Sequence, residues 1–396
     1  MWPEKNGKTF RIRDEVDGRK VTVESGFATK TAAKQRIVIL KAEQLSGTAI
    51  SRSAADITLA DWWDKWWPDH KTDLAPSTVH KQEERWRLHI RPLLGTFTLR
   101  ELDDDGAEYI PAWVAMLQDP DEELEGRNPL SAKTIACCHG LLSSMLKAAS
   151  TGRARRMRWN PCRETKLPEI IEREQRYLTE PEIARLIAAM PKRYRVLVLL
   201  LVTTGLRIGE ALALRVKHVD LLARRLRVER TLGEVGGELV EGTPKSKRSR
   251  RTVTYPERVA LALAPLCAGR GREERVFTAL GGGDLRQSKI WKWWGKTCAD
   301  AGLEGLRVHD LRHTHAAQLI ADNVSPVGIS RRLGHASITV TMDTYGHLME
   351  WTEEAILAAT ERSIELIDFR GILGDSAPEP PGTGLRSTEL VPAQRG

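Results

Sequence analysis

The hydrophobic and polar positions at the start of the chain alternate and then change to a helical period. Residues 8–23 predict two short strands, KTFRIR and RKVTV, around the turn signal Asp17-Gly18. A helix is predicted over residues 29–46, where an apolar stripe is formed by Ile37, Leu40, Ala42 and Leu45. This strand–strand–helix unit, residues 1–50, is too small to be very stable by itself.

The next part of the chain, residues 56–150, has a helical pattern throughout. The segment TLADWWDKWWPDH has large apolar residues at positions i, i+3, i+4, i+7 and i+8, which are Leu59, Trp62, Trp63, Trp66 and Trp67. This spacing predicts one broad apolar helix face and favours core aromatics over a ligand cage. A second helix is predicted to begin at Pro76 and to end before Gly95, with further helices near 104–118 and 131–150. The Pro- and Gly-containing segment QDPDEELEGRNP between them predicts a loop.

The pattern changes again after residue 150. Residues 151–176 are first basic, then contain prolines and have no periodicity, which predicts an interdomain linker. A capping box at Thr179 and Glu182 starts a mostly helical domain, residues 177–368, which has β character over roughly 226–255. The tail 369–396 is rich in Pro and Gly, and we predict that it is disordered.

Charge and cysteine content narrow the class of protein. Lys plus Arg exceeds Asp plus Glu by 61 − 53 = 8, with basic clusters at 152–158 and 244–251. Such clusters suit nucleic acid, although a solvated basic surface is the plain alternative. The five cysteines have no CxxC spacing, which argues against a disulfide framework and a zinc ribbon. With neither a signal peptide nor a membrane-length apolar run in the sequence, we expect a soluble protein of the cytoplasm.

Five stretches near the carboxyl end contain residues that suit phosphate chemistry. They are TTGLRIGEALAL, PKSKRSRRTV, HDLRHTH, LGH and DTYGH, and they contain Arg207, Lys245, His309, Arg312, His335 and Tyr345. Arginines grip phosphate oxygens as planar forks, and a tyrosine hydroxyl is a nucleophile when a base or cations activate it. Histidine and lysine can move the protons. His309 and His313 have the spacing of a metal pair, but Asp310 stands where HExxH needs Glu, so a metal site is disfavoured.

These stretches resemble the motifs of the tyrosine recombinase family, the phage-type integrases. TGLRIGEAL resembles the first arginine motif, PKSKRSRRTV the lysine hairpin, HDLRHTHA the His-x-x-Arg box and LGHASITVTMDTYGH the terminal box. The resemblance implies a mainly α fold with small β elements, in which a mixed, mostly helical catalytic domain follows a helical core-binding domain. Residues 1–50 look like an arm-type DNA-binding domain.

The resemblance also implies a role for each residue. Tyr345 would attack the scissile phosphate, form a 3′-phosphotyrosyl link and release a 5′-hydroxyl, while Arg207 and Arg312 would clamp the non-bridging oxygens. Lys245 would protonate the leaving oxygen; Lys247 in the same loop is the alternative.

The same resemblance implies two further catalytic residues, His309 and His335, and one supporting residue, Glu210. His309 would act as acid or base toward the nucleophile, and His335 would hydrogen-bond the phosphate. Glu210 would orient a neighbour. Neither a cofactor nor a metal is implied.

The implied partners are double-stranded DNA attachment sites, bound by a homotetramer that exchanges strands through a Holliday junction. The helix near 351–367 looks like the segment that docks onto a neighbouring protomer. A DNA-bending accessory protein and an excisionase are possible further partners of a bacterial, nucleoid-associated integrase. The alternatives are a dimer-resolving recombinase, a type IB topoisomerase and a catalytically silent DNA-binding protein; the amino-terminal unit favours an integrase.

Overall fold

The computed structural model describes residues 1–16, 19–45, 55–120, 128–151, 155–171, 174–243 and 247–349, together with residues 357 and 360. Several sequence predictions therefore fall outside the described residues. They are the turn at 17–18, most of the loop after residue 120, Lys245, all but two residues of the helix near 351–367, and the tail.

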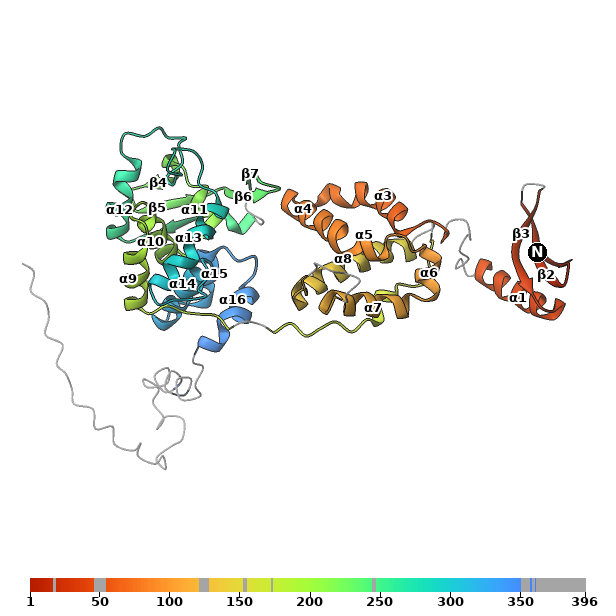
Figure 1. The fold of residues 1–396 in the computed structure, drawn as a ribbon. Coiled ribbons are helices and arrows are strands. Elements are labelled where there is room, and N and C mark those ends of the chain that lie inside the picture. Colours follow the sequence, from red (N-terminus) through yellow and green to blue (C-terminus); the bar gives the residue numbers. More distant parts are fainter. Residues whose placement is uncertain are drawn as a thin grey trace, which may run out of the picture.

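The amino-terminal unit has one strand more than the sequence predicted. Its antiparallel sheet has the order β1 (Trp2–Asn6), β2 (Thr9–Val16), β3 (Arg19–Phe27), and α1 (Lys30–Leu45) packs against it (Figure 1). Ile12, Ala33 and Ile37 form its small core. Ala42 of the predicted apolar stripe is exposed, so the buried face of α1 is narrower than expected.

The helical domain is built around tryptophans. Its elements are α3 (Leu59–His70), α4 (Pro76–Arg85), a π-helical turn (Trp86–Ile90), α5 (Arg91–Leu94), α6 (Leu99–Asp104), α7 (Gly106–Gln118) and α8 (Ala132–Ser150). Trp63 stacks between Trp67 and Trp86, with ring centroids 4.5 Å away on each side. This confirms the buried aromatic face of α3. Helix α6 is not predicted by the sequence pattern.

The segment after α8 begins by packing on the helical domain. Met157 and Cys162 are buried in its core, and the Arg158 guanidinium contacts the Asp103 carboxylate at 2.7 Å. A short 3₁₀ turn (Pro161–Glu164) follows, and the described chain then runs on without regular structure to α9 (Glu180–Ala189). The first part of residues 151–176 is therefore fixed to the helices that precede it.

The carboxyl-terminal domain is mostly helical with two small sheets (Figure 1). The capping box predicted at Thr179 is present, because Glu182 accepts a hydrogen bond from the Thr179 amide at 2.9 Å. The remaining helices are α10 (Lys192–Thr204), α11 (Ile208–Leu212), α12 (Glu257–Cys267), α13 (Gln287–Asp300), α14 (Asp310–Ala321), α15 (Pro326–Leu333) and α16 (Ile338–Tyr345). Of the helices that the structure describes, none has the length and apolar character to cross a membrane.

Both sheets of this domain are antiparallel. One has the order β4 (Val219–Asp220), β5 (Arg225–Val228), β8 (Arg251–Thr254), and the other is the hairpin of β6 (Thr231–Val235) and β7 (Glu238–Gly242). Gly236 at the hairpin tip lies against the ring of His80 on α4, so the hairpin reaches the helical domain (Figure 1).

Candidate active site

A sharp turn between α10 and α11 positions Arg207. Gly205 ends α10 with φ of 66°, and a Cβ there would lie 2.6 Å from Leu333 and 2.8 Å from His315, so only glycine fits without strain. Arg207 then caps α11: its amide donates to Glu210 Oε2 at 2.9 Å, and its Nη1 donates to Oε1 at 3.0 Å. The Arg207 side chain stays 40% exposed, so the guanidinium is held at the surface of the site.

Glu210 is the buried anchor of this turn. Its side chain is 2% exposed and also accepts hydrogen bonds from Nη1 and Nη2 of Arg251 on β8, at 3.1 and 3.0 Å. Burial alone would raise the pKa of Glu210, but Arg251 and Arg207 outweigh it and lower that pKa. Glu210 is therefore an anion that links two arginines.

Arg312 on α14 is fixed by two backbone carbonyls. Its Nη1 donates to Gly205 O at 2.6 Å, and its Nη2 donates to Leu333 O at 2.7 Å. The residue is 2% exposed, and burial together with the charge of Arg207 lowers its pKa to about 9. It therefore remains a cation at neutral pH, and each terminal nitrogen has a second N–H that can donate to an oxygen ligand.

Two of the predicted histidines flank the arginines. His335 is buried; its Nδ1 lies 2.8 Å from Thr341 Oγ1, and burial together with Arg312 and Arg207 lowers its pKa to about 4. His309 precedes α14 at the exposed rim of the site. Partial burial of the ring lowers the pKa of His309 below its ordinary value, and the neighbouring His313 and Arg312 lower it further. Both imidazoles are therefore neutral at neutral pH.

Tyr345 is the last residue of α16 and is 1% exposed. Its ring packs in an apolar cluster with Ala316, Ile320, Ile329 and Leu333. Burial raises the pKa of Tyr345 to about 12, although Arg312 and Arg207 act in the opposite direction. The hydroxyl is therefore protonated at neutral pH, and the residue is buried in the protein.

Two polar residues of the site were missed in the sequence. The Tyr345 hydroxyl lies 2.9 Å from Nδ1 of His313, a residue considered only as a metal ligand. Arg251, the partner of Glu210, was counted only as part of a basic cluster. The two contacts join residues that are 32 and 41 positions apart in the chain, so no local sequence pattern predicts them. Within the described part of the chain, no group of three or more His, Cys, Asp or Glu side chains could hold a metal ion.

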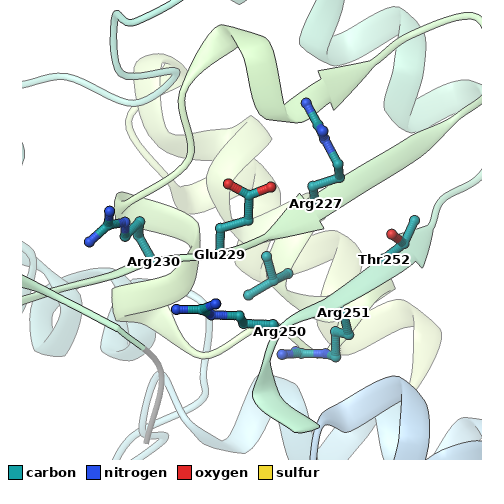
Figure 2. A pocket seen from close by; sticks show the side chains of 7 residues that line it. Arg227, Glu229, Arg230, Arg250, Arg251 and Thr252 are labelled. Atoms are coloured by element: carbon teal, nitrogen blue, oxygen red, sulfur yellow. The ribbon is translucent and has the colours of Figure 1, made fainter. Parts of the chain in front are cut away.

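A basic groove lies next to these residues on the β5–β8 sheet. It is lined by Arg227, Val228, Glu229, Arg230, Arg250, Arg251 and Thr252 (Figure 2). Arg227, Arg230 and Arg250 are exposed, whereas Arg251 is directed to Glu210. The groove therefore joins an exposed cationic surface to the buried charge network.

A DNA strand-transfer class of protein is indicated by this fold and by a tyrosine beside two fixed arginines. Residues 176–350 match the phage integrase family, and residues 58–105 match the phage integrase N-terminal SAM-like domain. The integrase of Mycobacterium phage FRAT1 is 30% identical over 298 residues, which cover 73% of this chain and 84% of that protein. A tyrosine recombinase XerC-like protein of Caldanaerobacter subterraneus is 28% identical over 388 residues, 87% of this chain and 94% of that protein.

A solved structure has the same fold. The Tn1549 transposon integrase, in complex with a circular intermediate DNA, superposes with a TM-score of 0.65 over 78% of this chain and 99% of that chain, at 19% identity. The chain belongs to the phage integrase family of tyrosine recombinases.

Proposed function

We propose that this protein is a site-specific recombinase that integrates a mobile element, such as a phage or an integrative plasmid, into DNA and, with a partner, excises it. The observation that carries the proposal is the shared site of Tyr345 and Arg312, whose guanidinium is held by Gly205 O and Leu333 O. A cation fixed before the reaction stabilises the charge that develops on a phosphate under attack without further reorganisation.

In the proposed reaction, Tyr345 attacks the scissile phosphorus and takes the 3′ end of the cut strand. Arg312 donates from the buried side of the site and Arg207 from its surface, so the two contact different non-bridging oxygens. His335, neutral and buried, hydrogen-bonds the phosphate. Lys245 protonates the departing 5′ oxygen. The phosphodiester energy stays in the phosphotyrosyl link, and a 5′-hydroxyl from a second strand reverses the step through a Holliday junction.

The basic groove supports binding along a DNA backbone next to the reacting phosphate. Arg227, Arg230 and Arg250 present three exposed cations there, and such contacts position a protein on DNA without specifying the sequence. We assign residues 1–50 to arm-site binding, 56–150 to core-site binding, 151–176 to the linker and 177–368 to catalysis. The strand-rich unit at 1–50 favours an integrase over a dimer-resolving recombinase. The active assembly is a homotetramer on DNA in the bacterial cytoplasm.

A duplex with a nick near the cleavage site tests the proposal. Cleavage of this substrate releases a short oligonucleotide, and without its 5′-hydroxyl the strand cannot be rejoined, so the covalent complex accumulates. Candidate core sites come from the DNA that flanks the gene. We expect a protein–DNA complex that survives denaturation, and Tyr345→Phe should abolish it without weakening DNA binding. Tyr177→Phe is the matched control, since Tyr177 is a half-buried tyrosine whose hydroxyl contacts Gln175 and His347 instead. A Tyr345→Phe variant that still forms the complex contradicts the proposal.

A further inference from the structure

The only hydrogen bond that the structure describes for the Tyr345 hydroxyl is the one with His313. The distance from Oη to Nδ1 is 2.9 Å, and the two rings meet edge to face with centroids 5.7 Å apart. The other two histidines of the site have different neighbours. Nδ1 of His335 contacts Thr341, and His309 lies at the exposed rim, where its ring and that of His313 are nearly perpendicular. His313 is therefore the histidine in contact with the nucleophile.

The surroundings of His313 keep its ring neutral. Its half-burial, with Arg307 and Arg312 nearby, lowers the pKa of His313, and Asp310 offsets this only in part. Among the described residues, His309, which directly precedes α14, and the Tyr345 hydroxyl on α16 also face the ring. In the tautomer that carries the ring proton on Nε2, the protonated phenol donates its Oη–H to the Nδ1 lone pair.

We propose that His313 is the general base of the cleavage step, an inference that rests on the proposed recombinase function. As the bond from Tyr345 Oη to phosphorus forms and the bond from phosphorus to O5′ breaks, the Oη proton moves to Nδ1 of His313. The departing O5′ takes its proton from the general acid, which is Lys245 in the scheme above. In rejoining, the 5′-hydroxyl returns a proton to that acid, and the His313 imidazolium protonates the released Oη.

Proton transfer and attack are coupled in this step. The phenol is a much weaker acid than the imidazolium of His313, so the proton does not leave Oη in the free protein. It leaves as charge moves from Oη onto the phosphate, next to Arg312 and Arg207. His309 is then available at the rim to contact the phosphate, in place of the acid–base role expected from the sequence.

Single-turnover cleavage of the nicked duplex tests the role of His313. His313→Ala should lower the cleavage rate by about 10²- to 10⁴-fold, which is the usual contribution of a general base to the rate. DNA binding and the thermal melting temperature should not change. Added imidazole should restore part of this rate. His313→Asn keeps an acceptor near the place of Nδ1 but takes no proton, and it should stay as slow as His313→Ala. His347→Ala is the control: this exposed histidine contacts Tyr177 and should leave the rate unchanged.

A second substrate separates the base from the acid. Sulfur in place of the bridging O5′ gives a leaving group that needs no protonation, so it should restore cleavage to Lys245→Ala but not to His313→Ala. A wild-type rate in His313→Asn, or rescue of His313→Ala by sulfur, would overturn the inference. If the wild-type protein forms the covalent complex and His313→Ala forms it equally fast, the inference fails while the proposed function stands. If the wild-type protein forms no complex on any substrate, the proposed function itself fails.

Discussion

Glu210 offers the sharpest test of how the site is held together. The variant Glu210→Gln removes the charge but keeps the size of a side chain that is 2% exposed, beside an Arg251 side chain that is 6% exposed. Removing one partner of a buried ion pair leaves the other charge uncompensated, at about 3–5 kcal/mol. A glutamine oxygen still accepts one hydrogen bond, so we expect a loss of about 3 kcal/mol in the free energy that holds α10, α11 and β8 together.

The matched control for this variant is Glu182→Gln. Both glutamates are the third residue of a helix and accept a hydrogen bond from the capping residue at 2.9 Å. Glu182 is 21% exposed and its guanidinium neighbour, Arg176, is 39% exposed. Its loss should therefore cost about 1 kcal/mol or less. The comparison isolates burial and the contact with Arg251.

Hydrogen exchange followed by mass spectrometry is the suitable assay, because a chain of several domains does not unfold in a single step. Peptides from α10 and β8 should lose protection in Glu210→Gln and keep it in Glu182→Gln. Cleavage should also slow by about 10- to 100-fold, because Arg207 loses the charged partner that orients it. If the two variants lose the same protection, the buried network does not hold the turn.

The pH dependence of this loss has a definite sign. The pKa of Glu210 is lowered in the folded protein, so its contribution is fully present above the unfolded value of about 4.3. It is lost as the pH falls through the folded pKa. The difference between wild type and Glu210→Gln should therefore be constant near neutral pH and should shrink in acid.

Two further predictions concern the turn and the groove. Gly205→Ala should destabilise the carboxyl-terminal domain by at least about 2 kcal/mol, because Gly205 has a positive φ and a Cβ there would meet close neighbours. Gly295→Ala on α13, where a Cβ meets no atom within 4 Å, should stabilise the domain by about 0.5–1 kcal/mol. Thermal melting of the two variants measures both effects. Arg230→Gln and Arg250→Gln should each reduce the slope of log Kobs against log salt by about 1. The control is Arg258→Gln, at an exposed position of α12 outside the groove. An unchanged slope would remove the groove from the DNA interface.

Local periodicity was enough to predict much of the fold. The i, i+3, i+4 spacing of the tryptophans determines the buried face of α3, and the capping box at Thr179 marks the start of α9. Strand β1 could not be predicted in the same way, because Trp2–Asn6 contains a proline and charged residues and does not alternate clearly. Its strand conformation depends on pairing with β2, a tertiary contact.

The environment of Tyr345 could not be predicted from its neighbours in the sequence. Adjacent Thr344 and Gly346 suggest an open position, yet the ring is 1% exposed. The apolar surfaces that cover it come from α14 and α15, and His313 reaches its hydroxyl from 32 positions away. The motif residues themselves were recognisable, but burial and partners depend on how these helices pack.

The most direct test of the account is to identify the residue that becomes linked to DNA. The trapped covalent complex would be digested with protease and nuclease, and the peptide that carries the nucleotide would be sequenced by mass spectrometry. The account predicts that, among the five tyrosines of the chain, Tyr345 alone carries the 3′-phosphoryl group. Attachment to Tyr177, to any other residue, or through the 5′ end of the cut strand would contradict it.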